Sequence, residues 1–278
     1  MFKYRLISFP LLLALVAVLF FWKQGGHYLF SVIAVAAAGA ILFEAARLFE
    51  KIKVKNYPLL CAACGSLVTA AFCMDKFNWF KTALARPVAA GILCLLGIST
   101  LLLMIGKKNK AVRRIAGSIS ICAVIGLPIL LLVAIYFRTL GGISLLLYVI
   151  CVVKSMDTGG YIFGLSSAKL LLGGNHKIAP SISPNKSWEG VAGGMLFSVA
   201  VSLIFYRFIG GDIRPYIWNG IILSLLSLAG DLTESSLKRS AKVKDSANWI
   251  PGMGGIFDVF DSFLYVGYFM LISTSLGK

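Results

Sequence analysis

The sequence contains few charged residues, and very few of these are acidic. Charged residues make up 14% of the 278-residue chain, compared with about 25% in soluble globular domains. Asp and Glu together number 11 and His numbers 2, whereas Lys and Arg number 27. With 59% hydrophobic residues, this composition excludes an ordinary soluble domain. The net charge of +16 indicates anionic partners, and for a chain embedded in a membrane we expect lipid headgroups or an anionic substrate rather than nucleic acid.

The six cysteines form no pattern typical of a metal or redox site. Cys61 and Cys64 have the CxxC spacing, but no second pair follows at zinc spacing, and the only histidines are His27 and His176. All six cysteines lie in or beside apolar runs. We therefore interpret them as small buried hydrophobic residues.

The chain is instead rich in apolar runs of about 20 residues, the length that crosses the hydrocarbon core of a bilayer. We predict an all-α, polytopic integral membrane protein with about nine transmembrane helices, of which the sixth and eighth are the shortest. The start resembles a signal peptide but lacks a small-residue cleavage site, so we expect it to be a retained first span. The predicted spans are residues 10–22, 28–46, 57–74, 88–105, 115–137, 140–156, 189–209, 216–231 and 256–275. Residues 1–137 and 138–278 would form one membrane domain, with the catalytic site in the second group.

Most of the 27 Lys and Arg residues fall in the predicted segments on the same side as the N-terminus. The positive-inside rule therefore predicts a cytoplasmic N-terminus, in the cell (inner) membrane. In this topology, five acids lie at cytoplasmic helix ends: Asp157, Glu189, Asp231, Asp258 and Asp261. The acids Glu44, Glu50, Asp75 and Asp212 are scattered. Carboxylates from four different helices thus converge on one membrane face, which predicts a cytoplasmic functional site.

Residues 230–262 contain five of the eleven acids. Asp231 and Glu234 are three residues apart, as are Asp258 and Asp261, so each pair shares a face if the segment is helical. Carboxylate oxygens on two neighbouring helices favour one or two Mg²⁺ ions with positions open to substrate phosphates. We predict Asp231, Asp258 and Asp261 as catalytic residues and metal ligands.

Basic residues and glycines lie between these acids. We predict that Lys238 and Arg239 are catalytic and that they form a phosphate clamp with Lys242 and Lys244. Gly254 and Gly255 allow close backbone approach just before a helix N-terminus, which favours anions. Upstream, Lys186 is predicted to meet a phosphate, and Asp157 and Glu189 to organise the site.

The run from Ser235 to Asp261 closely resembles the signature of the phosphatidate cytidylyltransferases, also called CDP-diglyceride synthases. The matching residues are Ser235, Lys238, Arg239, Lys244, Asp245, Pro251, Gly254, Gly255, Asp258 and Asp261. An Asp-Thr-Gly-like turn is matched at 157–161, an Ile-Ser-Pro…Trp-Glu-Gly segment at 182–190 and a Gly-Asp pair at 230–231. The resemblance covers roughly residues 150–270. Met253 stands where the family has His and Val259 where it has Arg, while Asn185 and Ser187 are milder departures.

The resemblance implies a nucleotidyltransferase of phospholipid biosynthesis that transfers CMP from CTP to phosphatidate, giving CDP-diacylglycerol and pyrophosphate. It also implies Mg²⁺ as cofactor, a second, monovalent cation such as K⁺, contact with membrane lipids, and a homodimer. The attacking phosphate oxygen is largely ionised at neutral pH, so the reaction needs positioning and charge neutralisation rather than a general base. We therefore expect activity despite Met253.

Two other functions remain open from the sequence. A CTP-dependent polyprenol or lipid kinase would need a base to deprotonate a lipid alcohol, and the cluster contains no histidine. A catalytically degenerate membrane lipid-binding scaffold is supported by Met253 and Val259, but the chain retains every acid. A transporter is disfavoured because the two halves contain no matching pair of broken helices.

Overall fold

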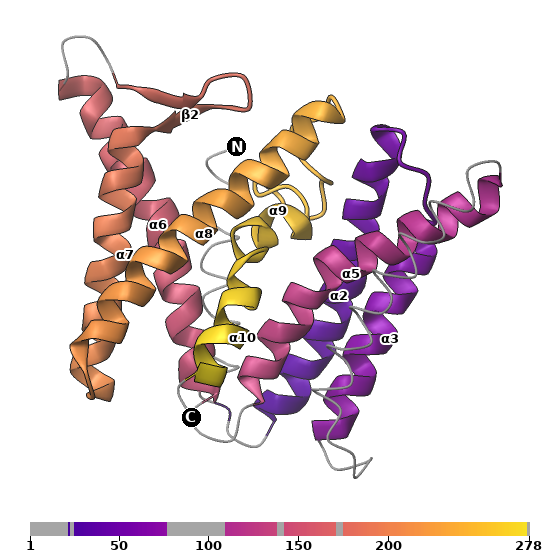
Figure 1. Cartoon of the computed structure of the whole chain (residues 1–278), viewed down its shortest axis with the longest axis horizontal. Coiled ribbons are helices and arrows are strands. Elements are labelled where there is room, and N and C mark those ends of the chain that lie inside the picture. The colour runs from indigo at the N-terminus through magenta and orange to yellow at the C-terminus, as the bar shows by residue number, and fades with distance from the viewer. Residues whose placement is uncertain (1–21, 23–24, 77–108, 138–141, 171–174, 277–278) are drawn as a thin grey trace. The chain divides into compact units, whose positions relative to one another are not determined.

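The computed structural model describes residues 22, 25–76, 109–137, 142–170 and 175–276 (Figure 1). The predicted first span, 10–22, and fourth span, 88–105, lie outside the described residues, apart from residue 22. The chain divides into two compact units. The first unit contains residues 1–137 and 240–260, and the second contains residues 138–239 and 261–278.

Among the described residues, five helices are long and apolar enough to cross a membrane. These are α2 (Gly26–Lys51), α5 (Lys110–Tyr136), α6 (Gly142–Leu170), α7 (Trp188–Ile209) and α8 (Ile213–Ser240). A shorter apolar helix, α3 (Pro58–Lys76), falls on the predicted third span. The protein is therefore a helical, multi-pass membrane protein.

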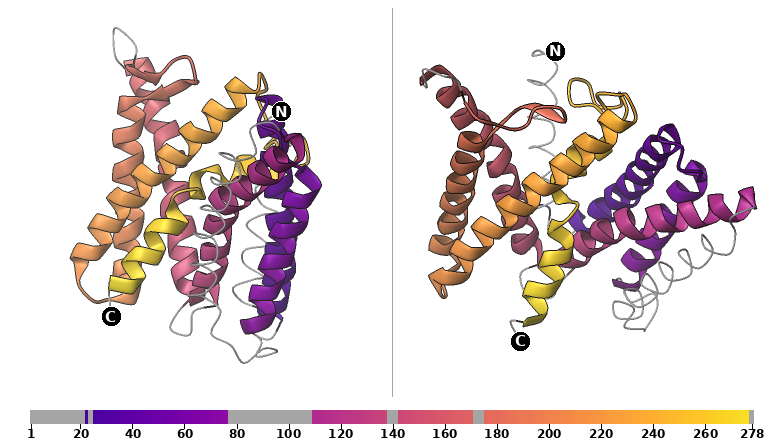
Figure 2. Two further views of the ribbon diagram at one scale, coloured as in Figure 1. Left: turned by 45° about the vertical axis from the view of Figure 1, so that its right-hand side comes forward. Right: turned by 45° about the horizontal axis from the view of Figure 1, so that its top comes forward.

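In the first unit, α2, α3 and α5 pack together as a bundle, seen as the indigo, purple and magenta helices of Figures 1 and 2. Part of their core is a cluster of Ala34, Phe72, Cys73, Leu130 and Val133. Asn109 begins α5 because its side chain accepts hydrogen bonds from the backbone N–H groups of residues 111 and 112, which otherwise have no partner within the helix. The short helix α9 (Ile256–Phe260) packs against α2 in the same unit.

In the second unit, α6 and α7 lie side by side along most of their length (Figure 2). Gly194 permits this approach, because a Cβ atom there would lie 2.7 Å from the carbonyl oxygen of Met156. Hydroxyl groups add polar contacts between the helices: Tyr148 Oη lies 2.8 Å from Ser202 Oγ, which donates to the Tyr216 carbonyl on α8. In a lipid bilayer the hydrophobic effect does not drive helices together, so close packing at small residues and hydrogen bonds between helices stabilise their association.

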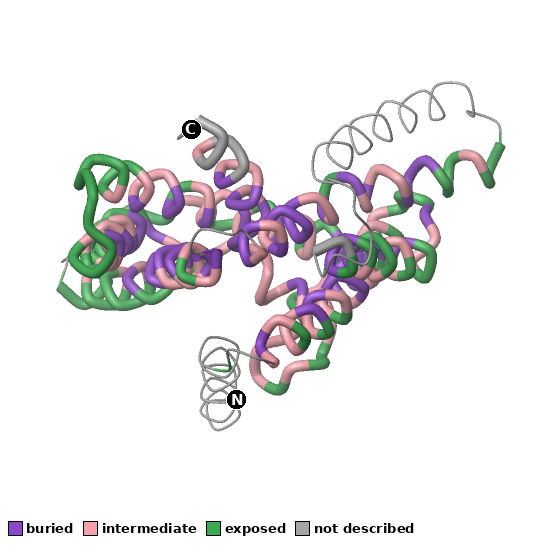
Figure 3. The backbone as a smooth tube through the Cα atoms, turned by 90° about the horizontal axis from the view of Figure 1, so that it is seen from below, coloured by how far each residue is buried: buried purple, intermediate pink, exposed green. Residues whose placement is uncertain are grey.

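A two-stranded antiparallel hairpin connects α6 to α7. Its strands are β1 (Lys177–Ala179) and β2 (Ser183–Ser187), with Lys177 opposite Ser187. Ser187 then begins α7 by accepting a hydrogen bond from the Gly190 N–H. The purely α-helical prediction missed this hairpin, whose residues are a mixture of exposed and partly buried positions except for the buried Ser187. Figure 3 shows the burial of the whole described chain.

Three local predictions need correction. The sixth and eighth spans are not short: α6 has 29 residues and α8 has 28, because both helices continue well past their apolar runs. The Asp-Thr-Gly segment at 157–159 is therefore helical rather than a turn, and Asp231 lies inside α8 rather than at its end. Asp258 and Asp261 do not share one continuous helix, since α9 ends at Phe260 and a 3₁₀ turn, η1 (Asp261–Phe263), begins before α10 (Val266–Leu276).

Candidate functional site

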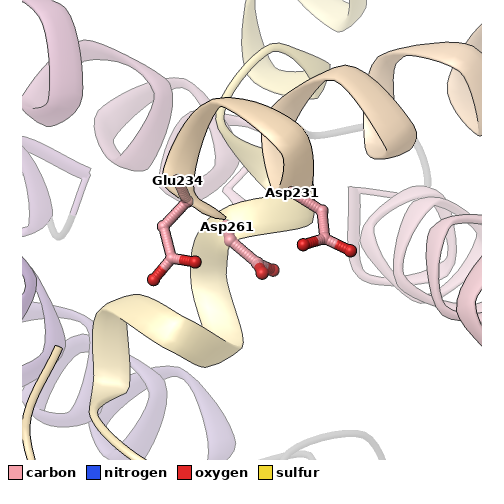
Figure 4. Close-up of side chains that lie close together, drawn as sticks. All are labelled: Asp231, Glu234 and Asp261. Carbon is pink, nitrogen blue, oxygen red and sulfur yellow. The ribbon is translucent and has the colours of Figure 1, made fainter. Parts of the chain in front are cut away.

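Three carboxylates converge in the second unit. Asp231 and Glu234 come from successive turns of α8, and Asp261 begins η1 (Figure 4). One carboxylate oxygen from each lies within 4.8 Å of the others. Within the described parts of the chain, this is the one group of three or more acidic, His or Cys side chains close enough to share a metal ion. Hard oxygen donors in this number suit a divalent cation such as Mg²⁺.

A glycine brings the two segments that carry these acids together. Gly230 is buried in α8, directly before Asp231. A Cβ atom at this position would collide with the backbone carbonyl of Asp261. The Gly-Asp pair noted in the sequence therefore lets η1 approach α8, so that Asp261 can reach Asp231 and Glu234.

Lysines accompany three acids of the second unit. Lys186, on β2, forms an ion pair with Asp231. The Lys238 ammonium lies 2.5 Å from Glu234, whose side chain has no solvent exposure. The Lys154 ammonium lies 3.3 Å from Asp157 Oδ2. It also donates a hydrogen bond of 2.6 Å to the hydroxyl of Ser262, the residue that follows Asp261 in the chain. The site therefore presents carboxylates for cations and ammonium groups for phosphates within the same small region.

The electrostatic environment makes Asp261 difficult to ionise. Asp261 lies in the 3₁₀ turn, outside the five candidate spans. Burial, followed by the negative charge of Asp231, raises the pKa of Asp261 to about 7, although the nearby Lys154 ammonium lowers it. Desolvation and like charge both disfavour the carboxylate form, so a bound cation would compensate both effects.

A cavity of about 270 Å³ opens beside this cluster, between α6, the hairpin, the start of α7 and α8. Asp157, Lys186 and Asp231 line it together with Tyr161 and Asn185. Apolar side chains such as Met156, Val191 and Leu228 complete the wall. A cavity with a largely apolar wall and a few convergent charged groups is typical of a small-molecule site.

Two predicted site residues tie the hairpin to the helices. Glu189 lies 2.6 Å from His176 Nδ1 and also accepts the His176 backbone N–H at 3.1 Å, so it fastens the base of the hairpin. Arg239 donates from Nε to the carbonyl of Ile182 at 3.2 Å, which holds the hairpin tip to the end of α8. These contacts position the strand that carries Lys186.

The remaining predicted residues belong to the first unit. Asp258 accepts hydrogen bonds from the Gly255 N–H at 2.6 Å and from the backbone and hydroxyl of Ser246. Gly254 has a φ of +92°, which favours glycine, and it closes a bridge with Ile250. Lys242 and Lys244 are exposed. For these residues, including Gly255, the roles in metal and phosphate binding stay predictions.

Sequence reasoning missed several residues that the structure places in these clusters. Glu234 was noted for its spacing but not predicted as a ligand, although a carboxylate one helical turn from Asp231 was the available signal. Lys154 is the cation one turn before Asp157, and its i, i+3 spacing within an apolar run could have identified it. Glu44 was considered scattered, yet it is an ionisable residue within an apolar span, which is a recognised sign of function.

These features define a membrane protein whose site combines acids, lysines and a cavity suited to phosphate-bearing ligands. The chain belongs to the cytidylyltransferase family, whose model matches residues 3–276. It is 32% identical over 256 residues to the phosphatidate cytidylyltransferase of Bacillus subtilis (strain 168), covering 90% of each chain. It is 44% identical over 127 residues to the protein of the same name from Staphylococcus aureus (strain COL), covering 45% of this chain and 46% of the relative.

Proposed function

We propose that this chain is a phosphatidate cytidylyltransferase, which transfers CMP from CTP to phosphatidate and releases pyrophosphate. The observation that carries this function is the acid and lysine cluster of the second unit, in a chain that matches the cytidylyltransferase family over nearly its whole length. An oxygen of the phosphatidate phosphate would form a bond to the α-phosphorus of CTP while the bond to the β-phosphate breaks. Neither candidate alternative is favoured by a structural observation or by a relative.

The residues of the cluster fit a divalent cation. Asp231, Glu234 and Asp261 would hold Mg²⁺, which supplies charge neutralisation at the triphosphate. Asp258 is retained as a proposed further ligand, and the second, monovalent cation stays a proposal.

The lysines would hold the phosphates. Lys186 and Lys238 are paired with Asp231 and Glu234, so a cation bound to these acids would release both ammonium groups to substrate phosphates. Lys154 would act similarly beside Asp157. Because the phosphatidate phosphate is already largely ionised, these contacts need only position and neutralise it.

The cellular arrangement is also part of the proposal. The proposed nine spans are the five candidate helices, α3, the α9–α10 segment and the two predicted apolar segments 10–22 and 88–105, which lie outside the described residues apart from residue 22. The basic residues favour a cytoplasmic N-terminus and site. The homodimer rests on the family resemblance alone.

The experiment uses purified protein in detergent with phosphatidate, Mg²⁺ and CTP labelled on either the α- or the γ-phosphate. Cytidylyl transfer predicts that the α-label, and not the γ-label, enters the lipid. A lipid kinase would transfer the γ-label to a lipid alcohol instead. If neither label reaches lipid in a folded, monodisperse sample, the chain is a degenerate scaffold and the proposal is wrong.

A further inference from the structure

Glu44 is a buried carboxylate within the candidate span α2. Its exposed fraction is 1%, yet both of its oxygens accept hydrogen bonds. Oε1 accepts the Ile256 N–H at 3.0 Å, and Oε2 accepts the Phe257 N–H at 2.9 Å and the Ser246 hydroxyl at 2.6 Å. All four residues belong to the first unit. The burial of a charge is tolerated only where donors converge on it in this way.

The two backbone donors are the first N–H groups of α9, which begins at Ile256. Such groups have no partner within their own helix and favour negative charge. Glu44, more than 200 residues earlier in the chain, supplies that charge. It therefore fixes where α9 starts, directly after the glycine turn that contains Gly254, so that Asp258 lies in the first turn of this helix.

Ser246 connects Glu44 to Asp258. The Ser246 hydroxyl lies 2.6 Å from Glu44 Oε2 and 3.0 Å from Asp258 Oδ2, but it has one proton to donate. Asp258 also accepts the Ser246 backbone N–H at 3.0 Å and the Gly255 N–H at 2.6 Å. The two carboxylates therefore share one hydroxyl and one loop, and a change at Glu44 alters the hydrogen bonds available to Asp258.

We propose that Glu44 is a positioning residue for cytidylyl transfer. It orders Ser246 and residues 255–258, and so sets the direction of the Asp258 carboxylate and the path of the glycine turn. The inference rests on the proposed function and on the part proposed for Asp258 in it. It gives an N-terminal helix a part in arranging the segment that carries the family signature.

Two substitutions at position 44 distinguish the effects of the charge and length of the side chain from the effect of its volume. Glu44→Gln keeps the size but presents one acceptor oxygen, so its amide group would face a donor. Glu44→Asp keeps both acceptor oxygens on a shorter side chain and should rescue part of the function. Glu50→Gln is the matched control, because Glu50 is an exposed acid on the same helix.

The experiment measures hydrogen exchange of the backbone amides and cytidylyl transfer on the same detergent-solubilised samples. Glu44→Gln should accelerate exchange of the peptide covering residues 246–258 while α5 keeps its protection. It should also lower kcat by about tenfold or more, the effect expected for the loss of a hydrogen bond to a charged group. Glu44→Asp should fall between Glu44→Gln and the parent, and Glu50→Gln should match the parent.

Unchanged turnover in Glu44→Gln, with or without faster exchange, would overturn the inference. A fall in turnover without faster exchange at 246–258 would also overturn it, because Glu44 would then act by another route. If Glu44→Gln does not fold, Ser246→Ala provides the test with the same expected and contrary outcomes. A parent without any transfer activity would contradict the proposed function, whereas an active parent with an equally active variant contradicts this inference alone.

Discussion

Lys186 and Asp231 form an ion pair that connects the hairpin to the interior of α8. Their side chains are 23% and 25% exposed, so the pair lies at the wall of the cavity rather than in open solvent. An acid proposed to bind a cation and a lysine proposed to bind a phosphate thus neutralise each other. When a metal and a phosphate enter together, each can replace one partner, and the charges remain balanced throughout.

Lys186→Gln should weaken substrate binding more than it weakens metal binding. Removal of one charge-assisted contact to phosphate predicts a rise of about tenfold or more in the KM for one of the two phosphate substrates. The cation no longer competes with the Lys186 ammonium for Asp231, so the half-saturating Mg²⁺ concentration should not rise. Steady-state kinetics in mixed micelles measure both quantities. Lys169→Gln, at an exposed position of α6, is the control, and an equal effect of both variants would contradict the prediction.

Glu234→Gln should destabilise the protein. Glu234 is buried, and the Lys238 ammonium, on a side chain that is 13% exposed, lies 2.5 Å from it. Removal of one member of a buried pair costs about 3–5 kcal/mol because the other charge is left without compensation, and a value near the lower end is expected here. The double variant Glu234→Gln/Lys238→Met should recover most of the thermal stability but not the transfer activity. Thermal unfolding in detergent measures the first effect.

The exposed pair Asp212–Arg214, at 3.9 Å, provides the comparison for this buried pair. Asp212→Asn should change the unfolding temperature little, because exposed pairs contribute about 0–1 kcal/mol. Equal melting temperatures for Glu234→Gln and the parent would contradict the structural role given to the buried pair.

Divalent-cation binding should strengthen as the pH rises from 6 to 8. The pKa of Asp261 is raised to about 7 by burial and by Asp231, so below pH 7 the group is mostly protonated and metal binding must release its proton. Affinity should therefore fall by up to about tenfold per pH unit well below the pKa and level off above it. Calorimetric titration with Mg²⁺, without substrates that titrate themselves, measures this dependence. A constant affinity across the range would be the contrary result.

Gly194→Ala should separate α6 from α7. A Cβ atom at position 194 would lie 2.7 Å from the Met156 carbonyl and 3.1 Å from the Gly160 nitrogen, which are backbone atoms that cannot move aside. Overpacking of this kind costs about 1–3 kcal/mol and should lower the unfolding temperature by several degrees. Gly164→Ala is the matched control, since its Cβ would be in ordinary contact at 3.6 Å from Ser187 Oγ. Equal effects would show that helix spacing does not depend on Gly194.

The sequence predicted the class of protein, and it singled out two of the acids that the structure brings together, because both depend on local patterns. Apolar runs of membrane length predicted the spans that became α2, α5, α6, α7 and α8. Asp231 and Asp261 were both expected in one cluster, because the first ends an apolar run at the Gly-Asp pair and the second begins another at the end of the signature segment. The spacing rule for Asp258 and Asp261 failed because it assumed a continuous helix, whereas the helix changes form after Phe260.

Contacts between distant segments could not be predicted in the same way. Nothing near Glu44 in the sequence indicates that its partners are Ser246, Ile256 and Phe257. Likewise, the glycines of the Asp-Thr-Gly segment were expected in a turn because of the family resemblance. Their packing against the Gly194 backbone is known only from the fold. The ends of α6 and α8 were placed too early because both helices continue through polar residues beyond their apolar runs.

The proposed role of the carboxylate cluster is tested most directly by the Mg²⁺-dependent transfer of α-labelled CMP to phosphatidate by the Asp261→Asn variant. Asp212→Asn is run in parallel as an exposed acid outside the cluster. We expect Asp212→Asn to form labelled lipid at the parental rate. Folded Asp261→Asn should form at least about a hundredfold less or require far more Mg²⁺, because it loses charge stabilisation on the order of several kcal/mol. Parental activity and parental Mg²⁺ dependence in folded Asp261→Asn would contradict the central claim that this carboxylate cluster performs the transfer.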